Sequence, residues 1–369
     1  LWKTIKNISL NAIGVKRTLD ELIRDGDVSK AMTLFQNRDN EVDQAIMEYN
    51  PETHEVMFRK NKIRKNREPY KVEKLPRAWQ RHINEVALYF LLANPIKWSK
   101  EDVNRYEDAF TAYNKFLAST RFNTTMRQAK RIAGAETECA KLYHIYRNEE
   151  TFAPEVKVVL LARSLGHTLR PMFDQYHNLI AFGYGYYLRE NGVTIEHFDI
   201  QTSANIIKCK RSFRSLNWDI ETTPNPSGKI NVIYYRQEKE WDGAELRINR
   251  DEMIDSKAAD VNNYFADPIV KISADPEMVG KVLQCDGENS VFEYVTPPTA
   301  SDMKEGEKKV LKESIHQDTM TPKFDYESML GLGTLSGDAL KRAMILGYMK
   351  RQNRMEIYDE LVDREKNLI

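Results

Sequence analysis

The residues that could do chemistry in this chain are few, and none stands at the spacing of a known catalytic motif. The sequence contains no Gly-x-Ser-x-Gly, His-Glu-x-x-His, Cys-x-x-Cys or phosphate-loop pattern. His144, His167 and His177 have no serine or cysteine partner in a recognisable setting, so we interpret them as structural histidines. We therefore expect a protein that is not an enzyme and that has no catalytic residues.

Two further patterns resemble ligand sites, but each lacks a required part. Asp251, Asp255 and Asp260 share one predicted helix, where we expect a solvated face with no loop that could wrap around a cation. The glycine-rich segment 331–337 precedes a helix, as phosphate-binding loops do. Its Ser-Gly-Asp ending replaces the required Gly-Lys-Ser/Thr, and Asp338 would repel a phosphate. The sequence thus predicts no metal and no cofactor.

Cysteine and tyrosine patterns are also interpreted structurally. Cys139, Cys209 and Cys285 lie far apart, which predicts unpaired thiols in a cytosolic chain and no four-ligand zinc site. The segment 183–187, with sequence Gly-Tyr-Gly-Tyr-Tyr, lacks the third glycine and the strand-to-helix setting of a dinucleotide-binding fingerprint. We expect its tyrosines to pack in a sheet.

Basic residues form two local groups in a chain whose overall charge is balanced. Lys and Arg total 55, as do Asp and Glu, so the basic excess typical of a dedicated nucleic-acid binder is absent. Segment 59–77 carries nine Lys and Arg against two Glu. It is either a phosphate-contacting strip or, as we prefer, a solvated loop or subunit contact. The second group consists of Lys304, Lys308, Lys309 and Lys312.

The composition predicts a folded chain with two or three domains. The chain has 369 residues, of which 41% are hydrophobic and 30% are charged. Its longest stretch without Asp, Glu, Lys or Arg has 14 residues, too few for a membrane helix. We recognise no signal peptide, and because the chain begins with Leu1, we interpret it as a trimmed or partly ordered fragment.

The first part of the chain reads as helices followed by strands. Helical patterns cover 1–50, 78–92 and 100–132, the last ending at Gly134, and an extended piece covers 55–58. Strands are predicted at 139–146, 156–161, 206–210 and 229–235, and 172–188 could form a helix or strand face.

The later part reads as two helices around a small β insert. The helices cover 250–266 and 299–320, and strand candidates lie at 269–272, 279–283 and 291–294. Both helices have thin apolar stripes, which predict packing against copies of themselves and not a private core. A loop at 321–337 with three glycines and a long helix at 338–369 follow. The fold class is α+β.

Three segments resemble motifs of the portal proteins of tailed double-stranded DNA phages, and they occur along the chain in the same order as in that family. Thr321-Pro322-Lys323-Phe324 and then Ser336 to Lys341 look like the portal pattern "TP" followed by "SGxAxK". Tyr89 to Ile96 resembles the family's "YFLxNPI" segment, within the broader match 84–97. Residues 254–262 resemble a shortened form of the family's "IDxxxxxxSDxAN" helix.

The resemblance implies the portal architecture. It implies a wing from 1–249 and 338–369, stem helices at 250–267 and 299–320, a β-type clip at 268–298, and a tunnel loop at 321–337. The family usually continues into a helical crown after the second wing segment, and we expect that crown to be either absent or not included in this sequence, which stops at Ile369. Portals form rings, typically twelve-fold, at one capsid vertex, and the genome is packaged and ejected through the channel. Terminase, which supplies the ATPase, and later the head–tail adaptor dock on the ring, which sits among major capsid proteins.

The resemblance also implies residues that face DNA and a location in the virion. The expected DNA- or channel-facing residues are Lys323, Tyr326, Thr334 and Ser336 of the tunnel loop, and Lys304, Lys308, Lys309 and Lys312 of the stem. Assembly would occur in the host cytoplasm, without a membrane. Two other interpretations remain open at this point: a nucleic-acid-processing enzyme with a split site, and a structural scaffold without DNA contact.

Overall fold

The chain folds into two compact units. The first, here called the sheet unit, comprises 1–46, 84–240 and 347–369, and the second, the two-helix unit, comprises 47–83 and 241–346. This computed structural model describes residues 17–62, 71–100, 106–150, 152–213, 215, 217–265, 270–272, 276–279, 282–285, 292–294, 301–323 and 341–369. Helices and strands are both abundant, so the α+β class is confirmed. Within these described ranges, no helix has the length and apolar character needed to span a membrane.

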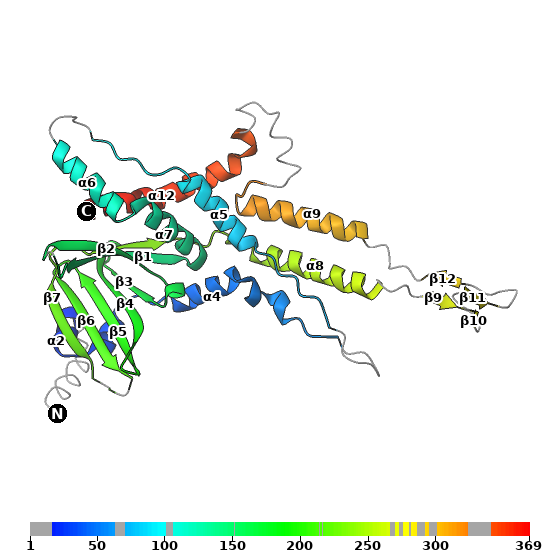
Figure 1. Ribbon diagram of the computed structural model, residues 1–369, viewed down its shortest axis with the longest axis horizontal. Coiled ribbons are helices and arrows are strands. Elements are labelled where there is room, and N and C mark those ends of the chain that lie inside the picture. Colours follow the sequence, from blue (N-terminus) through cyan, green and yellow to red (C-terminus); the bar gives the residue numbers. More distant parts are fainter. Residues whose placement is uncertain are drawn as a thin grey trace. The chain divides into compact units, whose positions relative to one another are not determined.

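Two antiparallel sheets form the centre of the sheet unit (Figure 1). The first has the order β2-β1-β8, with β1 at Glu138–Arg147, β2 at Pro154–Leu161 and β8 at Val232–Arg236. The second is a meander of β3 (Thr168–Phe173), β4 (Leu179–Glu190), β5 (Val193–Thr202), β6 (Asn205–Ser212) and β7 (Asp219–Pro224). The four predicted strands correspond to β1, β2, β6 and β8, while β3, β5 and β7 had no prediction.

Alternation along β1 explains how the first sheet is buried on both faces. Ala140 and Leu142 contribute to the core between the two sheets, whereas Cys139 and Tyr143 join the core on the helical side. Successive side chains of a strand point to opposite faces, so one strand can serve both cores. Cys139 is a free, buried thiol, and burial raises its pKa well above its ordinary value.

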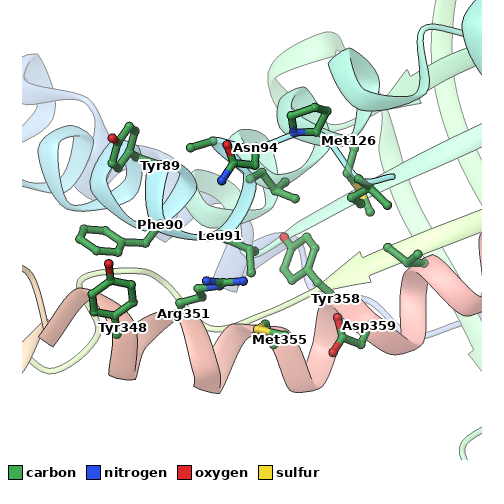
Figure 2. A pocket seen from close by; sticks show the side chains of 15 residues that line it. Tyr89, Phe90, Leu91, Asn94, Met126, Tyr348, Arg351, Met355, Tyr358 and Asp359 are labelled. Carbon is green, nitrogen blue, oxygen red and sulfur yellow. The ribbon is translucent and has the colours of Figure 1, made fainter. Parts of the chain in front are cut away.

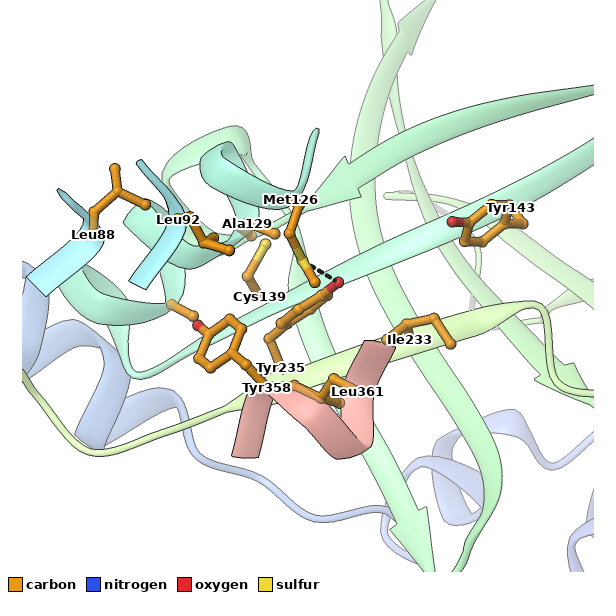
Figure 3. Packing of buried hydrophobic residues seen from close by; sticks show 12 residues of the cluster. Leu88, Leu92, Met126, Ala129, Cys139, Tyr143, Ile233, Tyr235, Tyr358 and Leu361 are labelled. Carbon is orange, nitrogen blue, oxygen red and sulfur yellow. Dashed lines mark hydrogen bonds between the residues drawn. The ribbon is translucent and has the colours of Figure 1, made fainter. Parts of the chain in front are cut away.

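Three helices contribute to the core on the helical side of the first sheet (Figure 3). They are α5 (Trp79–Leu92), α7 (Phe122–Glu136) and α12 (Ile345–Leu368). In this core the Tyr235 hydroxyl lies 3.2 Å from the Met126 sulfur. Tyr358 of α12 packs on Tyr235, with ring centroids 5.8 Å apart. Helix α12 is therefore anchored by aromatic packing to the strand β8.

The second sheet packs its other face on two short helices, α2 (Leu19–Arg24) and α3 (Val28–Met32). The glycine–tyrosine segment lies in β4, as expected for sheet packing. A Cβ on Gly183 would lie 2.6 Å from the Phe198 ring, so glycine is required there for this close approach. On the opposite face, the hydroxyls of Tyr184 and Tyr186 donate to Asp199.

Three sequence predictions about local structure before β1 are wrong. The helix predicted at 100–132 is two helices, α6 (Glu107–Ser119) and α7, because Arg121 between them is left-handed with φ 52°. Helix α7 continues through Gly134, where a Cβ would lie 2.0 Å from the Asn84 side-chain oxygen. That glycine allows close packing and does not end the helix. Residues Glu55–Phe58, predicted as extended, form the 3-10 helix η2 after η1 (Pro51–Thr53).

The two-helix unit contains α8 (Glu245–Phe265), α9 (Ser301–Asp318) and the short strands between them. Helix α4 (Asp39–Tyr49) leads into this unit, and η3 (Arg163–Leu165) lies in the other. Strand β9 (Val270–Ile272) pairs with β12 (Phe292–Tyr294), and β10 (Pro276–Val279) pairs with β11 (Val282–Cys285). The strand predicted at 279–283 is therefore wrong, because one strand ends at 279 and the next begins at 282.

Candidate nucleic-acid interface

Helices α8 and α9, which carry the stem lysines, share a small apolar core at one end. Ile248 of α8 and Ile315 of α9 are fully buried beside Trp241 and Ile83. The Trp241 indole donates to the Glu48 carboxylate at 2.9 Å. The prediction that these helices lack a private core is wrong at this end. Toward the other end of α9, Met303 and Val310 are 80% and 61% exposed.

Ion pairs connect the two helices along their length, and Figure 1 shows the helices side by side. Arg250 of α8 pairs with Glu307 of α9 at 2.7 Å, and Arg247 pairs with Asp318. Lys308 of α9 pairs with Asp255 of α8. The charges thus align two helices whose shared apolar core is small.

Acidic residues of α8 form a buried face, which corrects the prediction of a solvated one. Glu252 and Asp260 accept backbone N–H groups of Arg77 and Glu73 at 2.8 and 2.7 Å. Between them, the Ser256 hydroxyl oxygen accepts the N–H of Leu75 at 2.9 Å. Residues 71–78 belong to no helix or strand, so their N–H groups need side-chain acceptors once they are buried.

The periodicity of the two segments explains this match. The acceptors on α8 are four residues apart, which is about 6 Å along a helix. The donors are two residues apart, which is about 6.6 Å along an extended chain. Each turn of α8 therefore meets every second N–H of segment 71–78.

Two arginines of the basic segment 59–77 pair within the chain. Arg59 contacts Asp260 at 2.6 Å, and the Arg77 Nε donates to Asp255 at 2.8 Å. Burial opposes ionisation of Asp255, but the hydrogen bond from Lys308 and the charge of Arg77 outweigh it and lower the pKa of that carboxyl. These arginines hold α8 in place. Residues 63–70 of the basic segment lie outside the described residues.

His54 is the buried titratable base of the two-helix unit. Its Nδ1 lies 2.7 Å from Glu252 Oε1, and its Nε2 lies 2.7 Å from the Glu48 carbonyl oxygen. Both neighbours are acceptors, so the imidazolium, which donates from both nitrogens, fits this position. Burial opposes its charge, but the hydrogen bond and charge of Glu252 prevail and raise the pKa of His54 above 6.5.

We expect the stability of the two-helix unit to fall as pH rises because of His54. A raised folded-state pKa means that the stabilisation is complete below pH 6.5 and is lost as pH rises through the pKa of the folded protein. Each unit of pKa difference corresponds to about 1.4 kcal/mol. Urea unfolding of the His54→Gln variant at several pH values should show a weaker dependence than the parent chain.

His82 provides the matched control for this prediction. Partial desolvation lowers the pKa of His82, which is exposed, so its small contribution to stability is lost at low pH and is present at high pH. The His82→Gln variant should change the pH dependence in the opposite direction. Equal slopes for the parent and His54→Gln would contradict the assigned role of His54.

The lysines predicted to face DNA lie in different environments. Lys308 pairs with Asp255, and Lys323 is exposed and lies 3.2 Å from Glu313. Among the residues that the structure describes, Lys304, Lys309 and Lys312 have no ion pair. Lys309 is exposed, and Lys304 and Lys312 are half-buried. Tyr326, Thr334 and Ser336 lie outside the described residues.

The Thr-Pro motif ends α9 through a network of hydrogen bonds. The buried Thr321 donates its N–H to the His316 carbonyl at 2.8 Å, and its own carbonyl oxygen lies 2.9 Å from His316 Nδ1. Met320, just before it, is left-handed with φ 49°, which reverses the chain after the helix. This segment therefore has a structural role at the end of α9.

Comparison with models of known protein families gives a match that covers most of the chain. The family model described as phage portal protein, SPP1 Gp6-like, matches residues 28–365. This chain belongs to the phage portal protein family. No curated protein matches the chain. All three motif segments of this portal family member, 84–97, 254–262 and 321–341, lie inside the matched range, and the resemblance stated from the sequence is confirmed.

The sequence of this portal family member did not lead us to predict the buried acidic face of α8, although a pattern that indicates it was present. Glu252, Ser256 and Asp260 recur every four residues, which places three hydrogen-bond acceptors on one helical face. The same spacing is typical of solvated helices. Only the position of segment 71–78 distinguishes the two cases.

Proposed function

We propose that the chain is the subunit of a portal ring at one capsid vertex. The ring would surround the channel through which double-stranded DNA is packaged and later ejected. The observation that carries this proposal is the match to the portal family over residues 28–365. Portal proteins are structural components of the virion, and the chemistry of packaging would come from a separate terminase.

The parts of the proposed ring are named here as they are in the portal family. We assign residues 1–249 and 338–369 to the wing, 250–267 and 299–320 to the stem, 268–298 to the clip, and 321–337 to the tunnel loop. Support for the stem and clip comes from α8 and α9, which run beside each other, and from the short paired strands between them in sequence. We propose that terminase and the head–tail adaptor dock on the clip, and that the wing contacts the major capsid protein.

Exposed apolar residues on α8 and α9 support packing between copies. Met303 and Val310, seven residues apart, share one face of α9, and Leu246 of α8 is 83% exposed. Large exposed apolar groups of this kind are typical of interaction surfaces. Because the α8 and α9 surfaces differ, a contact between them would be head-to-tail, and head-to-tail contacts can close into rings.

A measurement of mass and shape tests the ring. We expect light scattering to give the mass of many subunits, twelve in the typical case, and negative-stain microscopy to show a central hole about as wide as a DNA duplex. The double variant Met303→Asp/Val310→Asp should shift the mass toward a single chain, because each aspartate would be buried unpaired at the contact.

The control variant is Leu165→Asp, which places the same charge at a half-exposed apolar residue of η3. It should keep the ring. Circular dichroism should be unchanged in both variants. A single-chain mass for the parent protein well above micromolar concentration would contradict the proposed ring.

A further inference from the structure

A pocket of about 480 Å³ lies within the sheet unit (Figure 2). One wall is the segment 89–96, which carries the Tyr-Phe-Leu-Leu-Ala-Asn-Pro-Ile motif, and the other wall is α12. Phe90 and Tyr348 face each other from the two walls at 5.5 Å between ring centroids. Glycine at 347 permits this approach, because a Cβ there would lie 2.4 Å from the Phe90 ring. The motif therefore builds one side of an aromatic pocket.

The lining of this pocket mixes aromatic and polar groups and has one charge of each sign. Tyr89 is 65% exposed and Tyr348 is 44% exposed, and Met355 and Tyr358 line the interior. Arg351 and Asp359 also line it, eight residues apart on α12, which is about 12 Å. Neither has an ion pair with any residue in the described part of the chain. A pocket with aromatic walls and separated opposite charges suits an aromatic side chain flanked by a carboxylate and a base.

The tip of the β1–β2 hairpin presents such a group on the same chain. Phe152 is 65% exposed and left-handed with φ 54°, a costly conformation for a large side chain. It is held by two hydrogen bonds: its N–H donates to the Asn148 carbonyl at 2.9 Å, and its carbonyl accepts from Arg147 Nε at 3.0 Å. The Arg147 guanidinium also lies 5.3 Å from the ring centroid. The hairpin thus holds an exposed aromatic ring in a fixed position.

Charge at the hairpin tip complements charge in the pocket. Arg147 flanks Phe152 on one side, and the exposed carboxylate Glu150 lies two residues before it. Glu150 has no ion pair within the described ranges. Arg147 would meet Asp359, and Glu150 would meet Arg351. Phe152 is not among the residues that line its own chain's pocket, so a Phe152 that fills this pocket belongs to another copy.

The geometry points to a contact in which Phe152 of one copy inserts into the pocket between residues 89–96 and α12 of the next copy. This inference rests on the proposed ring and names a contact within it. The two surfaces are different, as a head-to-tail ring requires. A buried aromatic side chain seated in a pocket is the typical centre of such an interface.

Photo-crosslinking tests the contact in the intact assembled protein. A benzophenone analogue of phenylalanine replaces Phe152, and isotopically heavy and light chains are mixed before assembly. We expect crosslinks that join residue 152 of one copy to peptides of 89–96 or 345–362 in the other. The same probe at Tyr176, which is 73% exposed on another hairpin tip, should give no link to these peptides.

Charge reversal provides a second measurement. Arg351→Glu should weaken association about tenfold, because it places like charges together at the contact. Adding Glu150→Arg should restore it. A ring that forms normally without these crosslinks, or links confined to single copies, would overturn this contact and leave the ring proposal standing. A parent chain that forms no ring would overturn both.

Discussion

Replacing Glu240 by glutamine is expected to destabilise the sheet unit by about 3–5 kcal/mol, because it leaves buried cations without their counter-ion. The Glu240 carboxylate is fully buried and contacts Lys130 at 2.5 Å, Arg354 at 3.1 Å and Lys350 at 3.2 Å. Burial opposes its ionisation, but these three cations prevail and hold the pKa of Glu240 well below its usual range. Lys130 is also fully buried and has no access to water that could replace the carboxylate.

Urea unfolding of Glu240→Gln measures this effect, and Glu238→Gln is the matched control. Glu238 lies two residues away and is exposed, so its replacement should change stability by less than about 0.5 kcal/mol. Lys350 has a pKa lowered to about 8, chiefly by burial, and Glu240 limits that fall. The Glu240→Gln variant should lower the pKa of Lys350 further. Equal stability of the two variants would refute the assigned role of Glu240.

The second large effect is expected at Lys141 and Glu365, which join β1 to α12. Both side chains are fully buried and form an ion pair. Glu365 also accepts the hydroxyl of Tyr143, and the Tyr235 hydroxyl lies 3.2 Å from its other oxygen. Glu365→Gln leaves Lys141 charged and buried, with an expected cost of about 3–5 kcal/mol. Lys141→Met should cost less, because two tyrosine hydroxyls still donate to the carboxylate.

A double-mutant cycle tests this pair. The variant Lys141→Met/Glu365→Gln should lose about 1–3 kcal/mol less than the sum of the two single losses, since no unpaired charge remains buried. Glu360→Gln, at an exposed residue of the same helix that pairs with Arg364, should have almost no effect. Additive losses in the cycle would show that Lys141 and Glu365 do not act as a pair.

Both predictions concern the attachment of α12 to the rest of the sheet unit. Lys350 and Arg354 near its beginning bind Glu240, and Glu365 near its end binds Lys141. The pocket proposed to receive Phe152 lies along the same helix, beside the first of these attachments and before the second. Buried charge pairs thus fix the helix that forms one wall of the proposed subunit contact.

The sequence by itself determined the elements whose signals are local. Strands β1, β2, β6 and β8 are rich in β-branched or aromatic residues, and α5, α8 and α9 follow apolar helical spacing, so neighbouring residues suffice to predict them. The family was also readable from the sequence, because its motif segments at 89–96, 321–324 and 336–341 are each short and contiguous. Strands β3, β5 and β7 were missed, because much of their stability comes from pairing with neighbouring strands in the meander.

Only the tertiary structure decided which charges are buried and which partners they have. Glu240 meets Lys130 across 110 residues, and Lys141 meets Glu365 across 224. The acidic face of α8 is buried because segment 71–78, far away in sequence, brings N–H groups that need acceptors. A charged residue looks the same in a sequence whether it faces water or a buried partner. The difference is decided by desolvation, which depends on everything packed around the residue.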